Sequence, residues 1–199
     1  MVCQHFILYL MFNNIRRASV SEGAVLIGVS KMSISKAFDE LEAMQLPIRK
    51  ECNSRYFHWD LDWGTLLRNT LPRMSSPIRR EYRLAEAVDV RDGCLSGISM
   101  MAEKTQLGDN DYQTIAIDKK SDEIKRIDGA EVVPSFEKPQ QIVTVVNYLI
   151  RYKGEPSVDP VSAWLSLPEN YPTDARVRYE TGRLFAKVVD GWDPSWPLI

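Results

Sequence analysis

Apolar and polar residues over the first 28 positions of the chain follow the pattern of two helices. Residues 4–12 are apolar on most sides and predict a first, largely buried helix. A second helix is predicted to start at Ser19, because serine side chains accept hydrogen bonds from the free amide groups of a helix N-terminus. Gly28 is expected to end this segment, since glycine adopts a positive φ angle at little cost.

A third helix is predicted after a three-residue break. Ser30 is its expected N-cap, and Ile34, Phe38 and Leu41 recur at the spacing of one helix face. Pro47 is expected to end it, because proline cannot continue a helix.

Two extended runs, at residues 48–52 and 55–59, follow the third helix. Asn53-Ser54 separates them, and a two-residue turn that begins with asparagine predicts a β-hairpin, although the turn contains no glycine. Lys50 and Arg55 flank the predicted turn.

The second half of the chain mixes strands and helices. Short strands are predicted at residues 114–117 and 130–133. A last helix is predicted from Thr173 or Asp174 onward, because apolar residues then recur on one side. Together with the N-terminal helices and hairpin, this pattern predicts an α+β fold.

An apolar stripe between Pro139 and Gly154 permits two interpretations. Proline in a first helical turn and helical spacing of the residues behind it predict a helix. A strand is the competing interpretation, because several of the apolar residues are β-branched. The stripe consists of Ile142, Val145, Val146, Leu149 and Ile150.

Proline and serine residues mark a change of pattern in the middle of the chain. They are Pro72, Ser75, Ser76 and Pro77. Such residues are typical of connecting segments. We therefore expect a first domain at residues 1–70, a linker at 71–90 and a second domain at 91–199.

The formal net charge of −2 is unevenly distributed along the chain. Residues 1–83 contain 12 basic and 8 acidic side chains, whereas residues 91–199 contain 13 basic and 17 acidic ones. A basic first part is consistent with a local nucleic-acid footprint, whereas the acidic second part is expected to be a poor ligand for DNA.

Cysteines and histidines do not form a catalytic or metal-binding pattern in the sequence. Cys3, Cys52 and Cys94 are odd in number, far apart and lack the spacing of zinc ligands, which favours a reduced, cytoplasmic protein. His5 and His58 belong to no triad, and His58 is expected to pack beside its neighbours. We expect no enzymatic activity, no cofactor and no metal.

One apolar run near the N-terminus, at residues 6–12, is too short to span a bilayer. Positive charge follows this run instead of preceding it, unlike in a signal peptide. A protein with no membrane partner is therefore expected.

The predicted order of three helices and a hairpin describes a winged helix-turn-helix. Packing of the third helix by its apolar face turns its N-terminal end outward, where side chains meet base edges and phosphates. The predicted DNA contacts are Lys31, Met32, Ser33, Ser35 and Lys36 in the helix, with Lys50 and Arg55 in the hairpin.

Residues 19–50, SVSEGAVLIGVSKMSISKAFDELEAMQLPIRK, resemble the helix-turn-helix of bacterial winged-helix transcriptional regulators of the MarR-like kind. Such proteins favour LGVSKSTVSRALDELE, which is close to IGVSKMSISKAFDELE here. Gln45 stands where a glycine usually ends the helix. The resemblance implies a sequence-specific repressor that binds double-stranded DNA.

Three later segments resemble the second domain of winged-helix proteins similar to abortive-infection (AbiEi-type) antitoxins. They are LPRMSSPIRREY (71–82), CLSGISMMAEKTQLG (94–108) and VDPVSAWLSL (158–167). Members of that family repress their own operon and are encoded beside a nucleotidyltransferase-like toxin. The resemblance implies a cognate toxin as partner of the second domain, and a homodimer is a further expectation.

Asp39, Glu40 and Glu42 crowd the C-terminal half of the predicted third helix. In a DNA groove they would repel phosphates, so we expect them to point to solvent or to pair with arginines. Because similar helical modules also bind proteins alone, the alternative function is a protein-interaction module that does not bind DNA.

Arg79, Arg80 and Arg83 form the densest basic cluster of the chain. They are interpreted either as an extra phosphate clamp beside the hairpin or as part of a solvated linker helix or domain contact. The second domain is expected to bind a protein or a second protomer, or to respond to a ligand.

Overall fold

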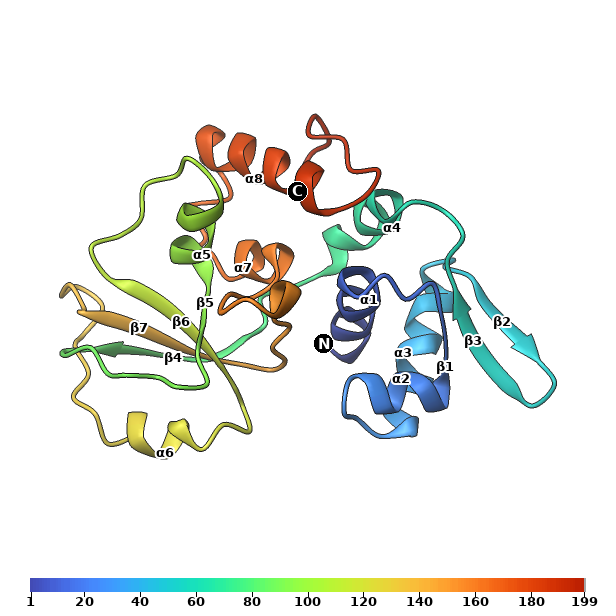
Figure 1. Cartoon of the computed structure of the whole chain (residues 1–199), viewed down its shortest axis with the longest axis horizontal. Helices are drawn as coiled ribbons and strands as arrows, with labels where there is room; N and C mark the ends of the chain where they lie inside the picture. Colours follow the sequence, from blue (N-terminus) through green and yellow to red (C-terminus); the bar gives the residue numbers. More distant parts are fainter. Residues whose placement is uncertain (199) are drawn as a thin grey trace. The chain divides into compact units, whose positions relative to one another are not determined.

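Residues Met1–Met74 of the computed structural model form one unit together with Val189–Trp192, here called unit 1 (Figure 1). Its elements are α1 (Val2–Phe12), β1 (Arg17–Ser19), α2 (Val20–Leu26), α3 (Lys31–Ala43), β2 (Ile48–Glu51), β3 (Ser54–His58), α4 (Trp63–Thr70) and the 3-10 helix η1 (Leu71–Arg73). The three strands form an antiparallel sheet in the order β1-β3-β2. The structure describes residues 1–198.

The N-terminal caps of α2 and α3 confirm the starts predicted from the sequence. The Ser19 hydroxyl accepts from the amide of Glu22 at 3.2 Å, and the Glu22 carboxylate accepts from the amide of Ser19 at 2.7 Å. These bonds hold the pKa of the Glu22 carboxyl below its usual value. At α3, the Ser30 hydroxyl accepts from the amide of Ser33 at 3.1 Å. Local sequence therefore determines where both helices begin.

Helices α1, α2 and α3 end in the same backbone geometry. One residue beyond the C-cap adopts a positive φ angle, which is 52° at Asn14, 64° at Gly28 and 61° at Gln45. After α3, the amide of Leu46 donates to the carbonyl of Leu41 at 2.9 Å, as in a Schellman motif. Gln45 occupies this position without the conformational freedom of glycine.

Replacing Gln45 by glycine should raise the free energy of unfolding by about 0.5–1 kcal/mol, because it removes the cost of a left-handed L-residue. Urea denaturation measures the change. Gly28→Ala is the converse test and should lower the free energy of unfolding. A Cβ atom at Gly28 meets no atom within 4 Å, so any loss of stability comes from the backbone conformation. An unchanged or lower stability of Gln45→Gly contradicts this prediction.

Aromatic rings from three elements form the centre of unit 1. The ring centroid of Phe6 on α1 lies 5.5 Å from that of Phe38 on α3 and 5.9 Å from that of Phe57 on β3. Ile34 and Leu41 are fully buried as well, which confirms the predicted apolar face of the third helix. The opposite face of α3 is thereby turned to solvent.

The β2–β3 hairpin is confirmed, with its turn one residue earlier than predicted. Glu51 pairs with Ser54, so Cys52 and Asn53 form the turn, and Cys52 takes a positive φ of 51°. Strand β1 was not predicted, because three residues are too few to show alternation. It adds to the hairpin through pairing with β3.

Residues Ser75–Val188 form unit 2, with part of the C-terminal segment. Its elements are β4 (Ile78–Leu84), β5 (Cys94–Leu95), α5 (Gly97–Lys104), β6 (Gln113–Asp118), α6 (Glu123–Ile127), β7 (Gln141–Val146), the 3-10 helix η2 (Tyr152–Gly154), α7 (Pro160–Leu165) and α8 (Ala175–Val188). The sheet order is β4-β7-β6-β5, with β6 and β7 parallel and the other pairs antiparallel. These elements make the chain an α+β protein, as predicted.

The helices of unit 2 lie on both faces of its sheet, with α6 on one side and α5 on the other (Figure 1). A core forms under α6 from Tyr82, Leu84, Ile117, Ile127, Val143 and Val145. On the other face, the Ser99 hydroxyl of α5 accepts from the amide of Thr114 on β6 at 2.9 Å. The central strands are therefore covered on both sides.

Of the two interpretations of the apolar stripe behind Pro139, the helix is wrong and the competing strand is confirmed, because residues 141–146 form the strand β7. This strand lies between β4 and β6, and all six of its residues are buried. A strand buried on both faces is apolar at successive positions, so its residues show no alternation and match a helical stripe as well.

The segment predicted as a linker, residues 71–90, contains β4, and the boundary between the units falls after Met74. Arg79, Arg80 and Arg83 accordingly lie in a strand, so the linker-helix interpretation is wrong. Residues 130–133 contribute a single bridge, between Leu84 and Val132, instead of the predicted strand.

Two predictions for the second half are confirmed. Strand β6 contains the predicted run 114–117. Helix α8 begins at Ala175, and the carboxylate of Asp174 accepts from the amide of Val177 at 3.1 Å. Over residues 1–198, no helix has the length and apolar character needed to cross a membrane.

Candidate nucleic-acid interface

Three of the predicted contact residues are exposed at the N-terminal end of α3. Lys31, Met32 and Lys36 point away from the buried face, and Met32 is 70 % exposed. Neither lysine makes an ion pair with any residue that the structure describes. The ammonium groups therefore remain available to an external anion.

The two predicted serines are less accessible than these lysines. Ser33 and Ser35 are half-buried. The Ser33 hydroxyl lies 2.9 Å from the Ser30 hydroxyl, within the cap of α3. Ser33 thus takes part in the helix start, while its hydroxyl retains further hydrogen-bonding capacity.

Arg55 does not extend from the hairpin as a free cation. Its guanidinium donates to Asp39 and to Glu42, both at 2.7 Å, and its side chain is 20 % exposed. The guanidinium carbon also lies 5.7 Å from the centre of the Phe38 ring. Unlike the other predicted contact residues, Arg55 therefore connects β3 to α3. Two of the three acidic residues on α3 pair with an arginine, as expected.

Lys50 lies on β2 and is exposed near the hairpin turn. It is opposite Arg55 in the strand register, yet it makes no ion pair among residues 1–198. The hairpin extends away from the helices of its unit (Figure 1). Lys50 is thus a further cation without an ion pair among the described residues, and it lies on the hairpin instead of on α3.

Most other cations of unit 1 are already paired with carboxylates. Arg17 binds Glu51 at 2.5 Å and lies over the Tyr56 ring at 4.3 Å. Arg49 binds Asp60 at 2.9 Å. Among the residues that the structure describes, exposed cations of unit 1 without an ion pair therefore include Lys31, Lys36, Lys50 and Arg73.

The basic character of unit 1 is weaker than the sequence suggested. Residues 1–74 contain nine basic and seven acidic side chains, and Asp190 in the segment 189–192 adds an eighth acidic one. The larger excess over residues 1–83 came from Arg79, Arg80 and Arg83, which belong to β4 in unit 2. Unit 1 therefore has only a small excess of positive charge.

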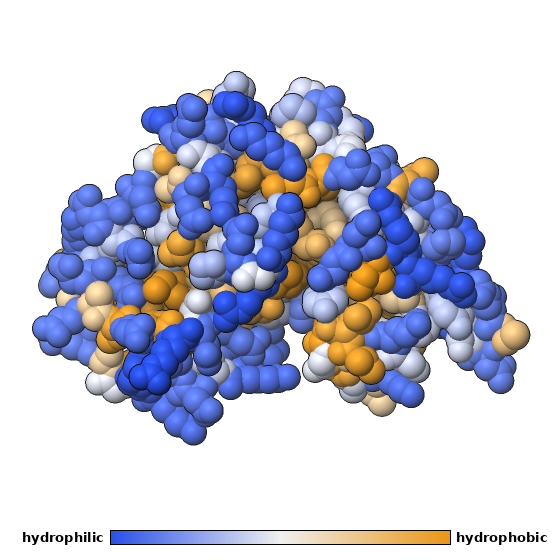
Figure 2. All heavy atoms as spheres, viewed as in Figure 1, coloured by the Kyte–Doolittle hydropathy of each residue, from blue (hydrophilic) through white to orange (hydrophobic). Residues whose placement is uncertain are grey.

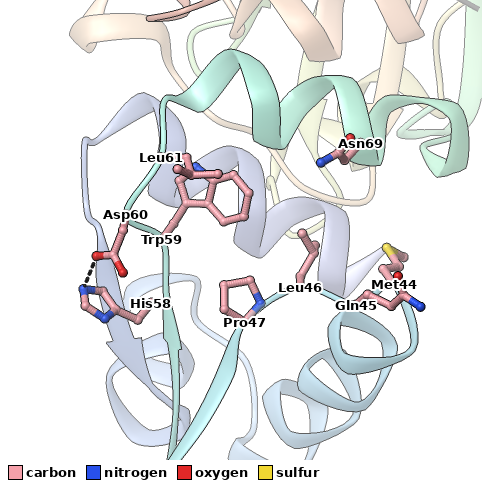
Figure 3. Close-up of a pocket in the computed structure, with 9 residues that line it drawn as sticks. All are labelled: Met44, Gln45, Leu46, Pro47, His58, Trp59, Asp60, Leu61 and Asn69. Atoms are coloured by element: carbon pink, nitrogen blue, oxygen red, sulfur yellow. Dashed lines mark ion pairs between the residues drawn. The ribbon is translucent and has the colours of Figure 1, made fainter.

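Unit 1 contains a cavity of about 660 Å³ that was not expected from the sequence. Figure 3 shows the residues that line it. It is lined by Met44, Gln45, Leu46, Pro47, His58, Trp59, Asp60, Leu61 and Asn69. His58, expected only to pack, instead places its Nε2 atom 2.9 Å from the Asp60 carboxylate. The lining comes from the segment between α3 and β2, from the end of β3 and the segment that follows it, and from α4, so no continuous motif in the sequence could reveal it.

Cysteines and acidic side chains form no metal-binding group within residues 1–198. Cys3 is buried on α1, and desolvation, together with the nearby Glu40 carboxylate, raises the pKa of its thiol to about 12. Burial also raises the pKa of Cys94. Both thiols are therefore unsuited to act as nucleophiles at neutral pH.

Comparisons of this chain with protein-family models, with curated proteins and with solved structures found no match.

Proposed function

We propose that unit 1 is a winged helix that binds double-stranded DNA and that the protein represses transcription by occupying its operator. The observation that carries this proposal is the pair of exposed, unpaired lysines, Lys31 and Lys36, at the N-terminal end of α3. This is the end of a recognition helix that meets base edges and phosphates.

The arrangement of elements supports this proposal. A tight turn at Gly28 joins α2 to α3, and the β2–β3 hairpin follows α3 directly. The free amide groups at the start of α3 add a partial positive charge that favours a phosphate. A helix entering the major groove would then bring the hairpin and Lys50 close to the backbone beside it.

Arg55 has a supporting role in this proposal. By pairing with Asp39 and Glu42, it neutralises carboxylates on the C-terminal half of α3 that would otherwise repel phosphates. The same two bonds hold β3 against α3, so the hairpin keeps a defined position relative to the recognition helix.

Gel shifts with the DNA upstream of its own gene, at two salt concentrations, test the proposal. Lys31→Ala and Lys36→Ala should each weaken binding roughly tenfold, because each removes a charge-assisted contact. Each should also reduce the slope of log affinity against log salt by about one. Lys187→Ala, which removes an exposed lysine of α8, is the matched control and should bind as the native protein does. Unaltered binding by both α3 variants would contradict the placement of the recognition helix.

A protein-interaction module is the second candidate function, and one observation favours it. Val25 on α2 is 83 % exposed, and Met32 on α3 is 70 % exposed. Figure 2 shows hydrophobic side chains gathered over this part of the unit. Exposed apolar patches often mark protein contacts. Absence of DNA binding by the native protein at low salt would favour this function over the first.

An antitoxin role is a narrower version of the first proposal. It is supported by the resemblance of the segments at 71–82, 94–108 and 158–167, and it adds a toxin as partner of unit 2. A nucleotidyltransferase-like gene beside this one, and copurification of its product with the full chain, are the expected results. Toxicity of that product unrelieved by this protein would reject the antitoxin version while leaving DNA binding intact.

A further inference from the structure

Unit 2 contains a positively charged cavity that the proposed function does not use. It has a volume of about 330 Å³ and lies at the end of the sheet where β4, β6 and β7 meet α6. Its lining, here called the basic pocket, consists of Arg79, Arg80, Tyr82, Lys119, Ile124 and Val145.

A β-bulge brings the two consecutive arginines to the same cavity. In a regular strand, neighbouring side chains point to opposite faces. Ile78 pairs with Val146 and Arg80 with Val145, so Arg79 is an extra residue without a partner on β7. Bulges redirect a side chain and recur beside functional sites. Here the bulge explains why Arg79 and Arg80 both line the pocket.

Arg80 is held in position by two contacts. Its guanidinium donates to the Asp128 carboxylate at 2.9 Å and lies 4.7 Å from the centre of the Tyr82 ring. The Tyr82 hydroxyl donates to the same carboxylate oxygen. An arginine has five N–H donors, so the remaining ones stay available to a second anion.

The other two cations of the pocket have no carboxylate partner. Neither Arg79 nor Lys119 makes an ion pair with a residue between positions 1 and 198, and both are exposed. The amide of Lys119 donates to the carbonyl of Val146 at 3.1 Å, which fixes its backbone next to β7. With Asp128 offsetting Arg80, the pocket keeps about two uncompensated positive charges.

We propose that the basic pocket binds the terminal phosphate of a phosphate monoester. A monoester carries about two negative charges at neutral pH and offers three acceptor oxygens, which matches two free cations and the remaining donors of Arg80. A phosphodiester of a nucleic-acid backbone carries one charge and matches this pocket less well. Tyr82, Ile124 and Val145 form an apolar wall against which the rest of the ester packs.

Calorimetric titration of the full chain at pH 8 and constant ionic strength tests this proposal. Inorganic phosphate should bind with a dissociation constant below about 10 mM, and dimethyl phosphate, a diester, at least tenfold more weakly. Arg79→Ala and Lys119→Ala should each weaken phosphate binding about tenfold. Lys120→Ala removes the adjacent exposed lysine, which is outside the lining, and should change binding less than about threefold.

Circular dichroism and thermal unfolding without phosphate show whether Arg79→Ala and Lys119→Ala are folded. We expect both to fold, because both native side chains are exposed. No saturable phosphate binding, or equal losses in all three variants, would overturn the proposal. Equal affinity for dimethyl phosphate, with Arg79→Ala weakening duplex DNA binding, would assign the pocket to a DNA surface instead. Lys31→Ala should leave phosphate binding unchanged, so failure of the DNA-binding function and failure of this site are distinguishable.

Discussion

Replacing Gly64 by alanine should lower the free energy of unfolding by about 3 kcal/mol, because the new methyl group has no room. A Cβ atom at Gly64 on α4 would lie 2.3 Å from the carbonyl carbon of Gly191 and 2.4 Å from the amide of Trp192. These are backbone atoms, which cannot rotate aside. The amide of Gly64 also donates to the carbonyl of Asp190 at 2.7 Å, so separation of the two segments would lose a hydrogen bond.

Residues 189–192 therefore form a strap across α4 within unit 1. Arg16 supports it, with its guanidinium 4.4 Å from the centre of the Trp63 ring and 3.8 Å from the Asp190 carboxylate. In Gly64→Ala, we expect the strap to be displaced and Trp192, buried in the native protein, to become exposed. Urea denaturation and tryptophan fluorescence measure these two effects.

Gly108→Ala is the matched control for the Gly64 experiment. A Cβ atom at Gly108 meets nothing within 4 Å, and this residue lies in an exposed loop. Its stability should stay within about 0.5 kcal/mol of the native value. A Gly64→Ala protein as stable as the control would show that the strap does not pack tightly on α4.

Asp159→Asn should raise the free energy of unfolding at pH 8 by up to about 3 kcal/mol, and by almost nothing near pH 4. Asp159 is fully buried at the N-cap of α7, and desolvation raises the pKa of its carboxyl from 3.8 to about 6. One oxygen accepts from the amide of Ser162 at 2.9 Å, whereas the other, Oδ2, has no hydrogen-bond partner among residues 1–198. The ionised form is therefore poorly compensated.

The direction of the pH dependence follows from the raised pKa. The folded protein binds the Asp159 proton more tightly than the unfolded chain does, so this contribution to stability is complete below pH 3.8 and is lost as the pH rises through about 6. Asparagine is a good N-cap and carries no charge, so it preserves the bond to Ser162 without the cost of ionisation. The difference between variant and native protein should then increase between pH 4 and pH 8.

Asp62→Asn is the comparison for this measurement, because Asp62 caps α4 in the same way at a half-exposed position. Its effect should be within about 1 kcal/mol. Urea denaturation of both variants at pH 4, 6 and 8 gives the comparison. A pH-independent difference for Asp159→Asn would mean that the buried carboxyl stays protonated, or is solvated, across this range.

The first three helices of unit 1 were predictable because their signals are local, whereas α4 was not predicted. A cap such as Ser19 or Ser30 bonds to an amide three residues away, and the apolar face of α3 repeats along one helix. Their short range also explains why Lys31 and Lys36 were correctly placed on the exposed side of α3. These features depend only on neighbours in the chain.

Strand β7 shows where local pattern is insufficient. Its residues suit a helix or a strand, and pairing with β4 and β6 determines which one forms. Those partners lie dozens of residues away, and nothing within the segment itself records them. The same holds for β4, which looked like part of a linker.

Charge pairing is the second feature that only the tertiary structure decided. Arg55 and Lys50 look alike in the sequence, yet Arg55 binds Asp39 and Glu42 while Lys50 makes no ion pair among the described residues. The sequence alone determined the first three helices of unit 1, the caps of α2 and α3 and the exposed end of α3, because a helix is closed by bonds within three or four residues. Which strands pair, which cations stay free and where cavities form depend on contacts between distant segments, and these exist only after the chain has folded.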